Sequence, residues 1–253
     1  MNLKYHRQIA ILGILLISIG AWGRADEPKT TEKARGTGEA PMLEAVDTPT
    51  PEILDPLTYS VNFRFYNQGG IASRLLIGPL KRVNLGLTFD SQNVIGSGNP
   101  QLIRPSVYFK LRMFDGSDIL PALALGYDSQ GELWQQSTKQ FLNREKGLYL
   151  VAGHEILIPN LEVHLGTNIY DFQNASQSVG GFVGSTFKIT PAFALLAEYD
   201  NIHSAPQNRI NLGGRYFVAP YFYVDFAARN VGRGNAAGAE RIVRLNYTGN
   251  FPL

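Results

Sequence analysis

Three histidines follow residue 25, and they are the first residues to consider for catalysis. His203 is followed directly by Ser204, but neighbouring side chains on an extended chain point to opposite faces, which separates a nucleophile from its base. His164 lies two residues from Glu162 on one predicted strand face, a spacing more typical of a structural hydrogen bond. The chain has no cysteine, no zinc-type ligand spacing and no phosphate-binding glycine loop. We therefore predict that the protein is not an enzyme and has no cofactor or metal.

Charged side chains that alternate with apolar ones are the second group of candidates. They fall on one face of the alternating segments, with ten cationic and seven anionic members between residues 57 and 253. If this face lines a water-filled lumen, its cationic excess favours anionic solutes. The alternative is an internal network of ion pairs that fills a narrow barrel, because buried charges need partners. The candidate lumen-lining and solute-binding residues are Arg64, Arg82, Asp90, Arg104, Lys110, Arg112, Glu162, Lys188, Glu198, Arg215, Asp225, Arg229 and Arg244.

The elements that position these charges have a period of two. Apolar residues such as Tyr59, Val61, Phe63 and Phe65 alternate with polar ones, as expected of strands with one apolar and one polar face. No sustained helical spacing follows residue 25. Twelve strands are predicted, near residues 57–66, 71–78, 82–91, 102–114, 119–128, 147–156, 161–171, 180–189, 192–200, 209–217, 221–230 and 241–251.

The connections between these strands alternate between tight turns and longer polar loops. The longer loops are expected at 92–101, 129–146, 172–179, 201–208 and 231–240. This order is typical of an outer-membrane barrel, with an even strand number, short periplasmic turns and long external loops. A soluble β-sandwich or calyx also alternates apolar and polar residues, but its loops follow no such order. The predicted fold class is therefore all-β, a closed antiparallel transmembrane barrel of about twelve strands over residues 57–253.

The first 56 residues form two further zones. Lys4 and Arg7 precede an apolar run over residues 9–22, and small residues flank Arg24, so residues 1–25 are predicted to be a cleaved signal peptide. Residues 26–56 have a net charge of −5, five prolines and no aromatic residue, and are predicted to be a flexible periplasmic segment whose end docks locally. The leader contributes +3 and the barrel +4 to the total of +2. Nucleic-acid binding is therefore not expected.

The last segment, with Val243, Leu245, Tyr247 and Phe251, resembles the C-terminal assembly signal of bacterial outer-membrane proteins, which implies recognition by the barrel-insertion machinery. Residues 48–127 resemble the YjbH-like outer-membrane barrels associated with exopolysaccharide, on the motifs TPTPEILDPLTYSVNFRFYNQGG (48–70), LKRVNLGLTFD (80–90) and IGSGNPQLIRPSVYFKLR (95–112).

The sequence predicts that the protein lies in the outer membrane, in contact with its lipids. Three functions remain open for such a protein. The first is a small-solute pore or transport channel with a slightly cationic lumen. The second is an accessory barrel in envelope or exopolysaccharide export, with polysaccharide or envelope-protein partners. The third, and least supported, is a lipid-modifying enzyme.

Overall fold

The computed structural model describes residues 39–143, 145–156, 158–174, 178–202, 208–231 and 239–252. The predicted signal peptide, the first part of the acidic segment and His203 lie outside these residues. Twelve strands form the wall of the barrel, and they are β1 (Thr58–Tyr66), β2 (Gly70–Leu80), β3 (Val83–Gln92), β5 (Ser106–Phe114), β6 (Ala122–Asp128), β9 (Gly147–Glu155), β10 (Leu161–Ile169), β11 (Val179–Thr190), β12 (Phe193–Asp200), β13 (Arg209–Ala219), β14 (Phe222–Arg229) and β15 (Glu240–Asn250).

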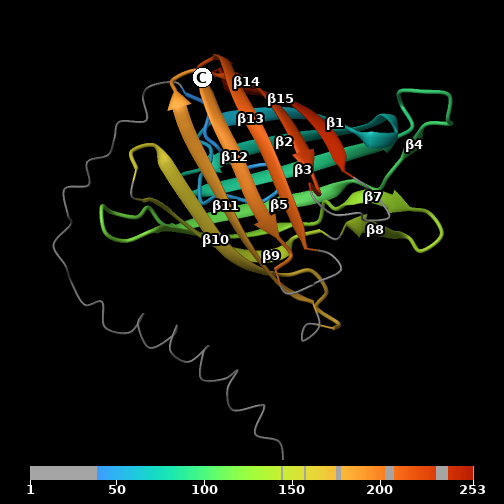
Figure 1. Cartoon of the computed structure of the whole chain (residues 1–253), viewed down its shortest axis with the longest axis horizontal. Coiled ribbons are helices and arrows are strands. Elements are labelled where there is room, and N and C mark those ends of the chain that lie inside the picture. The colour runs from blue at the N-terminus through green and yellow to red at the C-terminus, as the bar shows by residue number, and fades with distance from the viewer. Residues whose placement is uncertain are drawn as a thin grey trace, which may run out of the picture. The chain divides into compact units, whose positions relative to one another are not determined.

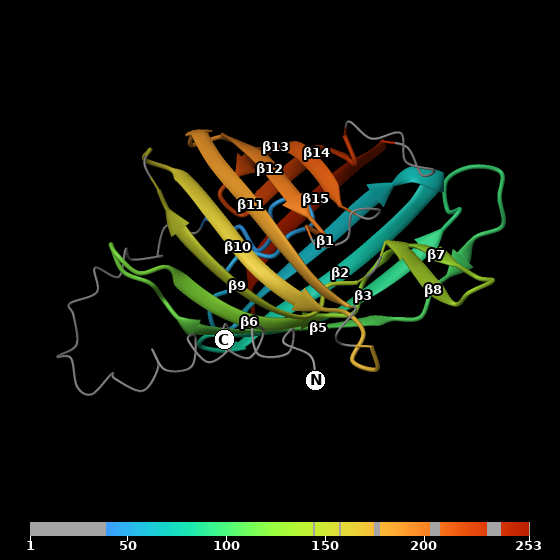
Figure 2. The ribbon, with the colours of Figure 1, turned by 60° about the horizontal axis from the view of Figure 1, so that its bottom comes forward.

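The barrel is closed by pairing of the first and last strands. β1 pairs with β2 on one side and with β15 on the other, and all neighbouring strands are antiparallel. In the seam between β1 and β15, Arg64 lies directly opposite Arg244. No wall strand among the described residues is left with a free edge, which a barrel requires. Figures 1 and 2 show the strands tilted relative to the barrel axis around a common interior.

The prediction of a closed, twelve-stranded, all-β barrel is confirmed. Every predicted strand corresponds to one wall strand, and the largest differences are at two strand starts. β5 begins at Ser106 rather than 102, and β6 begins at Ala122 rather than 119. In both cases a proline, Pro105 or Pro121, directly precedes the strand, and its missing N–H cannot donate to the ladder.

Side chains along each strand alternate between an apolar exterior and a polar interior. Outward residues such as Leu165 and Phe226 are 62% and 61% exposed, whereas the inward Arg244 is 0% exposed. Along the described wall strands, the outward positions carry one Asp, Glu, Lys or Arg side chain, that of Arg241. The exterior is therefore a continuous apolar surface, and the charges predicted for one face are gathered inside.

The two ends of the barrel differ in their connections. Short connections such as 81–82, 191–192 and 220–221 lie at one end, together with the start of β1 and the end of β15, and this is the turn end. The longer connections lie at the loop end, where β1 and β2 are joined by the short 3-10 helix η1 (Asn67–Gly69). The connection 129–146 holds a small hairpin of β7 (Glu132–Gln135) and β8 (Gln140–Asn143), and β4 (Gln101–Leu102) extends the sheet beside β3. Among the described residues, no helix is long and apolar enough to cross a membrane.

Residues 39–56 include the end of the acidic segment, for which local docking is predicted, and they are docked over more of their length than the prediction gave. They lie inside the barrel, where Ala45, Thr48 and Thr50 are each 0% exposed, and they appear in Figures 1 and 2 as the blue chain between the strands. Composition alone indicated disorder because the segment has few apolar residues and many acids. The interior of this barrel carries charged and polar side chains, so the acidic segment is stabilised there by ion pairs and hydrogen bonds as well as by apolar packing.

Candidate functional site

Residues 39–56 form a hairpin within the lumen, here called the plug hairpin. Glu44 bridges to Pro49, and the Ala45 N–H donates to the Thr48 carbonyl at 3.0 Å, which places Val46 and Asp47 at the tip. The first limb passes the turn end, where the Ala40 N–H donates to the Pro220 carbonyl at 2.6 Å. The second limb returns to the turn end and continues into β1. Both limbs therefore leave the barrel by the same end.

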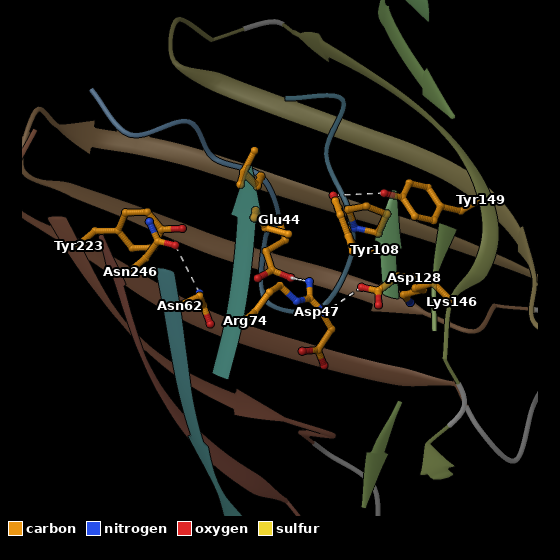
Figure 3. Close-up of a pocket in the computed structure, with 13 residues that line it drawn as sticks. Glu44, Asp47, Asn62, Arg74, Tyr108, Asp128, Lys146, Tyr149, Tyr223 and Asn246 are labelled. Atoms are coloured by element: carbon orange, nitrogen blue, oxygen red, sulfur yellow. Dashed lines mark hydrogen bonds and ion pairs between the residues drawn. The ribbon is translucent and has the colours of Figure 1, made fainter. Parts of the chain in front are cut away.

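Arginines from neighbouring strands hold the first carboxylate of the plug hairpin. Glu44 forms ion pairs with Arg64 of β1 at 3.7 Å, Arg74 of β2 at 3.7 Å and Arg244 of β15 at 3.4 Å. Like charges directly opposite each other on a sheet are destabilising, and Arg64 and Arg244 have this arrangement. The Glu44 carboxylate bridges them. Figure 3 shows Arg74 between Glu44 and Asp128, and the second of these contacts is 2.9 Å long.

The second carboxylate, Asp47, sits where the plug hairpin meets the connection from the loop end. It pairs with Arg64 at 3.2 Å and with Arg229 of β14 at 3.3 Å. Glu132, at the start of β7, reaches the same two arginines and also Arg209 of β13, at 3.2 Å. The lumen is thus occupied from both ends by acidic side chains that share Arg64 and Arg229.

The opposite side of the lumen binds the backbone of the hairpin tip. The Glu198 carboxylate of β12 accepts the N–H groups of Val46, Asp47 and Thr48 at 2.9–3.0 Å, and the Thr48 hydroxyl at 2.9 Å. Asn211 donates to the same carboxylate at 2.6 Å. Hydrogen bonds to a charged group each contribute about 1.5–3 kcal/mol, so Glu198 is a principal anchor of the tip.

Cationic side chains bind the carbonyl groups of the plug hairpin. The Lys110 ammonium of β5 donates to the carbonyls of Leu43, Thr50 and Glu52 at 2.9–3.0 Å and so joins the two limbs. Arg215 donates to the Glu44 carbonyl at 3.1 Å. The carbonyls of Ala45 and Val46 accept from Arg244, at 3.3 Å for Ala45.

Glycines in the wall make room for the hairpin. A Cβ atom on Gly184 of β11 would lie 2.7 Å from the Thr48 Oγ1 atom and 3.7 Å from the Ala45 Cβ atom. A Cβ atom on Gly153 of β9 would lie 2.7 Å from Pro51. Larger residues at these positions cannot be accommodated without movement of the plug hairpin.

Little space remains beside the hairpin. Two cavities, one around Glu44 and Arg74 and the other around Tyr66 and Asp90, have volumes of about 20 Å³ each. Each has room for about one water molecule. Apolar contacts fill further space, with Val46 packed among Tyr66, Leu196 and other side chains. In this state the described part of the lumen is filled rather than open.

Most of the predicted lumen residues do lie in the lumen. Arg215 and Asp225 form a two-point ion pair at 2.7 and 2.9 Å, and Asp225 also binds Arg244 at 3.1 Å, so the predicted internal network is present. Asp90 accepts from Tyr66 at 2.5 Å and Gln130 at 2.9 Å. The inward residues at or near full burial are Arg64, Asp90, Lys110, Arg112, Glu198, Arg215, Asp225, Arg229 and Arg244. Glu162 and Lys188 also point inward but lie at the turn end, where Lys188 pairs with Glu39.

Two predicted lumen residues lie elsewhere. Arg82 occupies the tight turn after β2 with a φ of 72°, and its 42% exposed side chain pairs with Asp115 outside the lumen. Arg104 is exposed between β4 and β5 and lies over the Trp134 ring at 5.7 Å. Both predictions were wrong for the same reason. The alternation was applied to residues before the first residue of a strand, Val83 of β3 and Ser106 of β5.

Several functional side chains were not among the predicted sites. Arg209 and Glu240 are at the first positions of β13 and β15 and share the inward parity of Arg215 and Arg244. Arg209 lies within the predicted strand 209–217 and follows from its alternation, and extending the alternation of the last strand by one residue reaches Glu240. Glu44, Asp47 and Glu132 lie in a segment and a loop without strand periodicity. Their signal was charge alone, because residues 39–56 contain five acids and no Lys or Arg.

The histidines form no catalytic arrangement in the described residues. His164 is buried with its Nε2 atom 3.2 Å from the Thr186 hydroxyl and its Nδ1 atom 3.6 Å from Glu162. Among the described residues, no three His, Cys, Asp or Glu side chains are grouped to hold a metal.

No protein-family model and no curated protein matches the chain. Several solved porin structures are similar to it. The KdgM porin has 16% identity and a TM-score of 0.42, over 76% of this chain and 99% of that one. The NanC porin has 11% identity and a TM-score of 0.39, over 77% and 100%.

A mutant of the Rhodopseudomonas blastica porin is also similar, with 12% identity and a TM-score of 0.37 over 71% of this chain. The chain spans 55% of the length of that porin. The barrel fold of this protein is established by its own strand pairing. The resemblance to the YjbH-like barrels stays a prediction.

Proposed function

We propose that the protein is an outer-membrane channel for small anionic solutes, which the plug hairpin holds closed. The apolar exterior fits a lipid bilayer, and the wall strands of about 7–12 residues have lengths suited to tilted transmembrane strands. The short turns of outer-membrane barrels face the periplasm, so in this proposal the plug hairpin enters the lumen from the periplasmic side. A closed barrel leaves no unpaired edge for lipid to solvate.

The observation that carries this proposal is the way the plug hairpin occupies the lumen. Both of its limbs leave by the turn end, so the tip can withdraw without threading the chain through the barrel. Its contacts with the wall are hydrogen bonds, ion pairs and packing. Withdrawal would uncover Arg64, Arg74, Arg229 and Arg244, and a lumen lined by arginines favours anions.

A release variant and a tether test the proposal. Lys110→Met with Glu198→Gln removes the strongest anchors of the hairpin backbone. Adding Ala45→Cys and Gly184→Cys to this release variant gives a disulfide, because the two Cβ positions are 3.7 Å apart. The Thr48 hydroxyl near the new Cβ atom can rotate once the Glu198 carboxylate is gone. No other cysteine interferes, since the chain has none.

The measurement is conductance in planar bilayers with a chloride salt gradient. The reduced protein is expected to conduct with a reversal potential that favours chloride, and the oxidised protein is expected to be silent. A release variant that still shows heat-modifiable gel migration, with an accessible hairpin tip but no conductance, would contradict the channel. That result would favour the accessory barrel, whose lumen does not conduct even when the hairpin leaves it.

A further inference from the structure

The contacts in the lumen are directed at a peptide backbone, and this goes beyond what a general anion pore requires. Three consecutive N–H groups at the hairpin tip meet one carboxylate, that of Glu198. Three carbonyls on two limbs meet one ammonium, that of Lys110. Asn84 of β3 accepts the Leu54 N–H at 3.1 Å. Glu198, Lys110 and Asn84 therefore bind backbone amide groups, which every peptide has, rather than particular side chains.

Arginines extend the same pattern along the first limb and over the tip. The carbonyls of Glu44, Ala45 and Val46 all accept from Arg215 or Arg244, and Arg64 also donates to the Val46 carbonyl at 3.3 Å. Arg215 and Arg244 are 0% exposed, and the Arg64 side chain is 14% exposed. A surface that satisfies successive backbone groups in this way is a built peptide-binding site.

Side-chain recognition is concentrated on two carboxylates. Glu44 lies two residues before the tip and Asp47 lies in it, and each pairs with Arg64 and with one further arginine of β14 or β15. The Arg64–Arg244 pair in the closing seam needs an anion between its members. A peptide without acids near its turn would remove one anionic partner from each of these arginines and leave them with Glu132, Glu240 and Asp225. The loss of an anion from a buried charge cluster is costly.

We propose that the lumen is a binding site for acidic peptides that enter as a hairpin, and that residues 39–56 are its resident ligand. This inference rests on the proposed function, since it names the solute class of the same lumen. An acidic peptide with Glu-x-x-Asp across a two-residue turn would compete with the plug hairpin for Arg64, Glu198 and Lys110. Peptide binding would then hold the plug hairpin outside.

The probe is a fluorescein-labelled synthetic peptide with the sequence of residues 39–56. A second peptide has Leu43, Val46, Ile53 and Leu54 replaced by Ala, which keeps the backbone pattern and both acids. A third has Glu44→Gln and Asp47→Asn, and a fourth is a scramble of the same composition. Binding is measured by fluorescence anisotropy on a full-length hairpin variant, with Glu44→Gln and Asp47→Asn in its own residues 39–56, and on the wild type, whose lumen is occupied. The hairpin variant weakens the resident segment but keeps Lys110 and Glu198 in the wall.

The first two peptides are expected to bind the hairpin variant at least about tenfold more tightly than the neutral and scrambled peptides. Binding to the wild type is expected to be weaker by a similar factor. Equal binding of the scrambled peptide would show simple charge attraction and overturn the proposal, as would equal binding to the wild type. Failure of the channel itself would be seen separately, because conductance is measured without peptide and anisotropy without a membrane current.

Discussion

Two sides of the lumen bind the same hairpin in different ways. Arg74, Arg64, Arg244 and Arg229 on the adjacent strands β2, β1, β15 and β14 form the arginine wall, which binds carboxylates. The facing strands β9, β11 and β12 form the backbone wall, with glycines and the Glu198 carboxylate against the hairpin backbone. The arginine wall selects for negative charge. The backbone wall selects for a peptide with small side chains where it approaches the wall glycines. A ligand has to satisfy both walls.

The comparison can be tested with one reporter. Val46→Cys puts a single thiol at the buried hairpin tip of a chain without cysteine, and its rate of labelling by a maleimide reports how often the tip leaves the lumen. All variants below are made in this background.

The largest effect is expected on the backbone wall at Glu198. Glu198→Gln keeps the shape but removes the charge that holds three N–H groups. The tip should lose about 3 kcal/mol of docking free energy, and labelling should accelerate roughly a hundredfold. The matched control is Glu162→Gln at the turn end of β10, where labelling should change by no more than about twofold. Unchanged labelling in Glu198→Gln would remove this residue as an anchor.

The next effect tests space rather than charge. Gly184→Val places a branched side chain against Thr48 and Ala45, and overpacking of this kind costs about 1–3 kcal/mol. Labelling of the tip should accelerate about thirtyfold for a cost of about 2 kcal/mol. Ser185→Val on the same strand points outward and serves as the control. If both variants label alike, close approach to β11 does not hold the hairpin.

A smaller effect is expected on the arginine wall. Glu44→Gln leaves Arg64 and Arg244 facing each other without their shared anion, which should cost about 1–2 kcal/mol. Adding Arg244→Met removes the repulsion, so the double variant should lose less than the sum of the two single variants by about 1 kcal/mol. The labelling rates of the four proteins give this coupling energy. Additive effects would show that Glu44 does not bridge the two arginines.

The smallest effect is expected at Arg82, outside both walls. Its ion pair with Asp115 is exposed at the turn end, and such pairs contribute about 0–1 kcal/mol. Arg82→Met should therefore leave the labelling rate and the midpoint of heat-modifiable migration unchanged. A large change at this position would mean that the turn end takes part in holding the plug hairpin.

The walls could be predicted from the sequence far better than their ligand. Period-two alternation places Arg64, Lys110, Glu198 and Arg244 on the inward face, because a strand fixes the direction of each side chain. The same rule fails at Arg82 and Arg104, where the chain leaves the strand.

The plug hairpin follows no periodic pattern. Low apolar content is evidence for disorder only when the surroundings are water, and residues 39–56 are instead surrounded by a wall whose arginines and Lys110 pair with their acids and carbonyls. Charge complementarity between the acidic segment and the inward arginines was visible in the sequence, but which strands would carry the contacts depends on the closed barrel. Long-range pairs such as Glu198 with Val46 therefore had no local signal.

The seam between β1 and β15 has a consequence for assembly. These strands are the two ends of the barrel sheet, and they meet with Arg64 opposite Arg244. Until Glu44 lies between them, electrostatic repulsion opposes their pairing. Glu44 therefore lowers the electrostatic cost of closing the ladder between the first and last strands, so the segment that fills the lumen also favours closure of the wall around it.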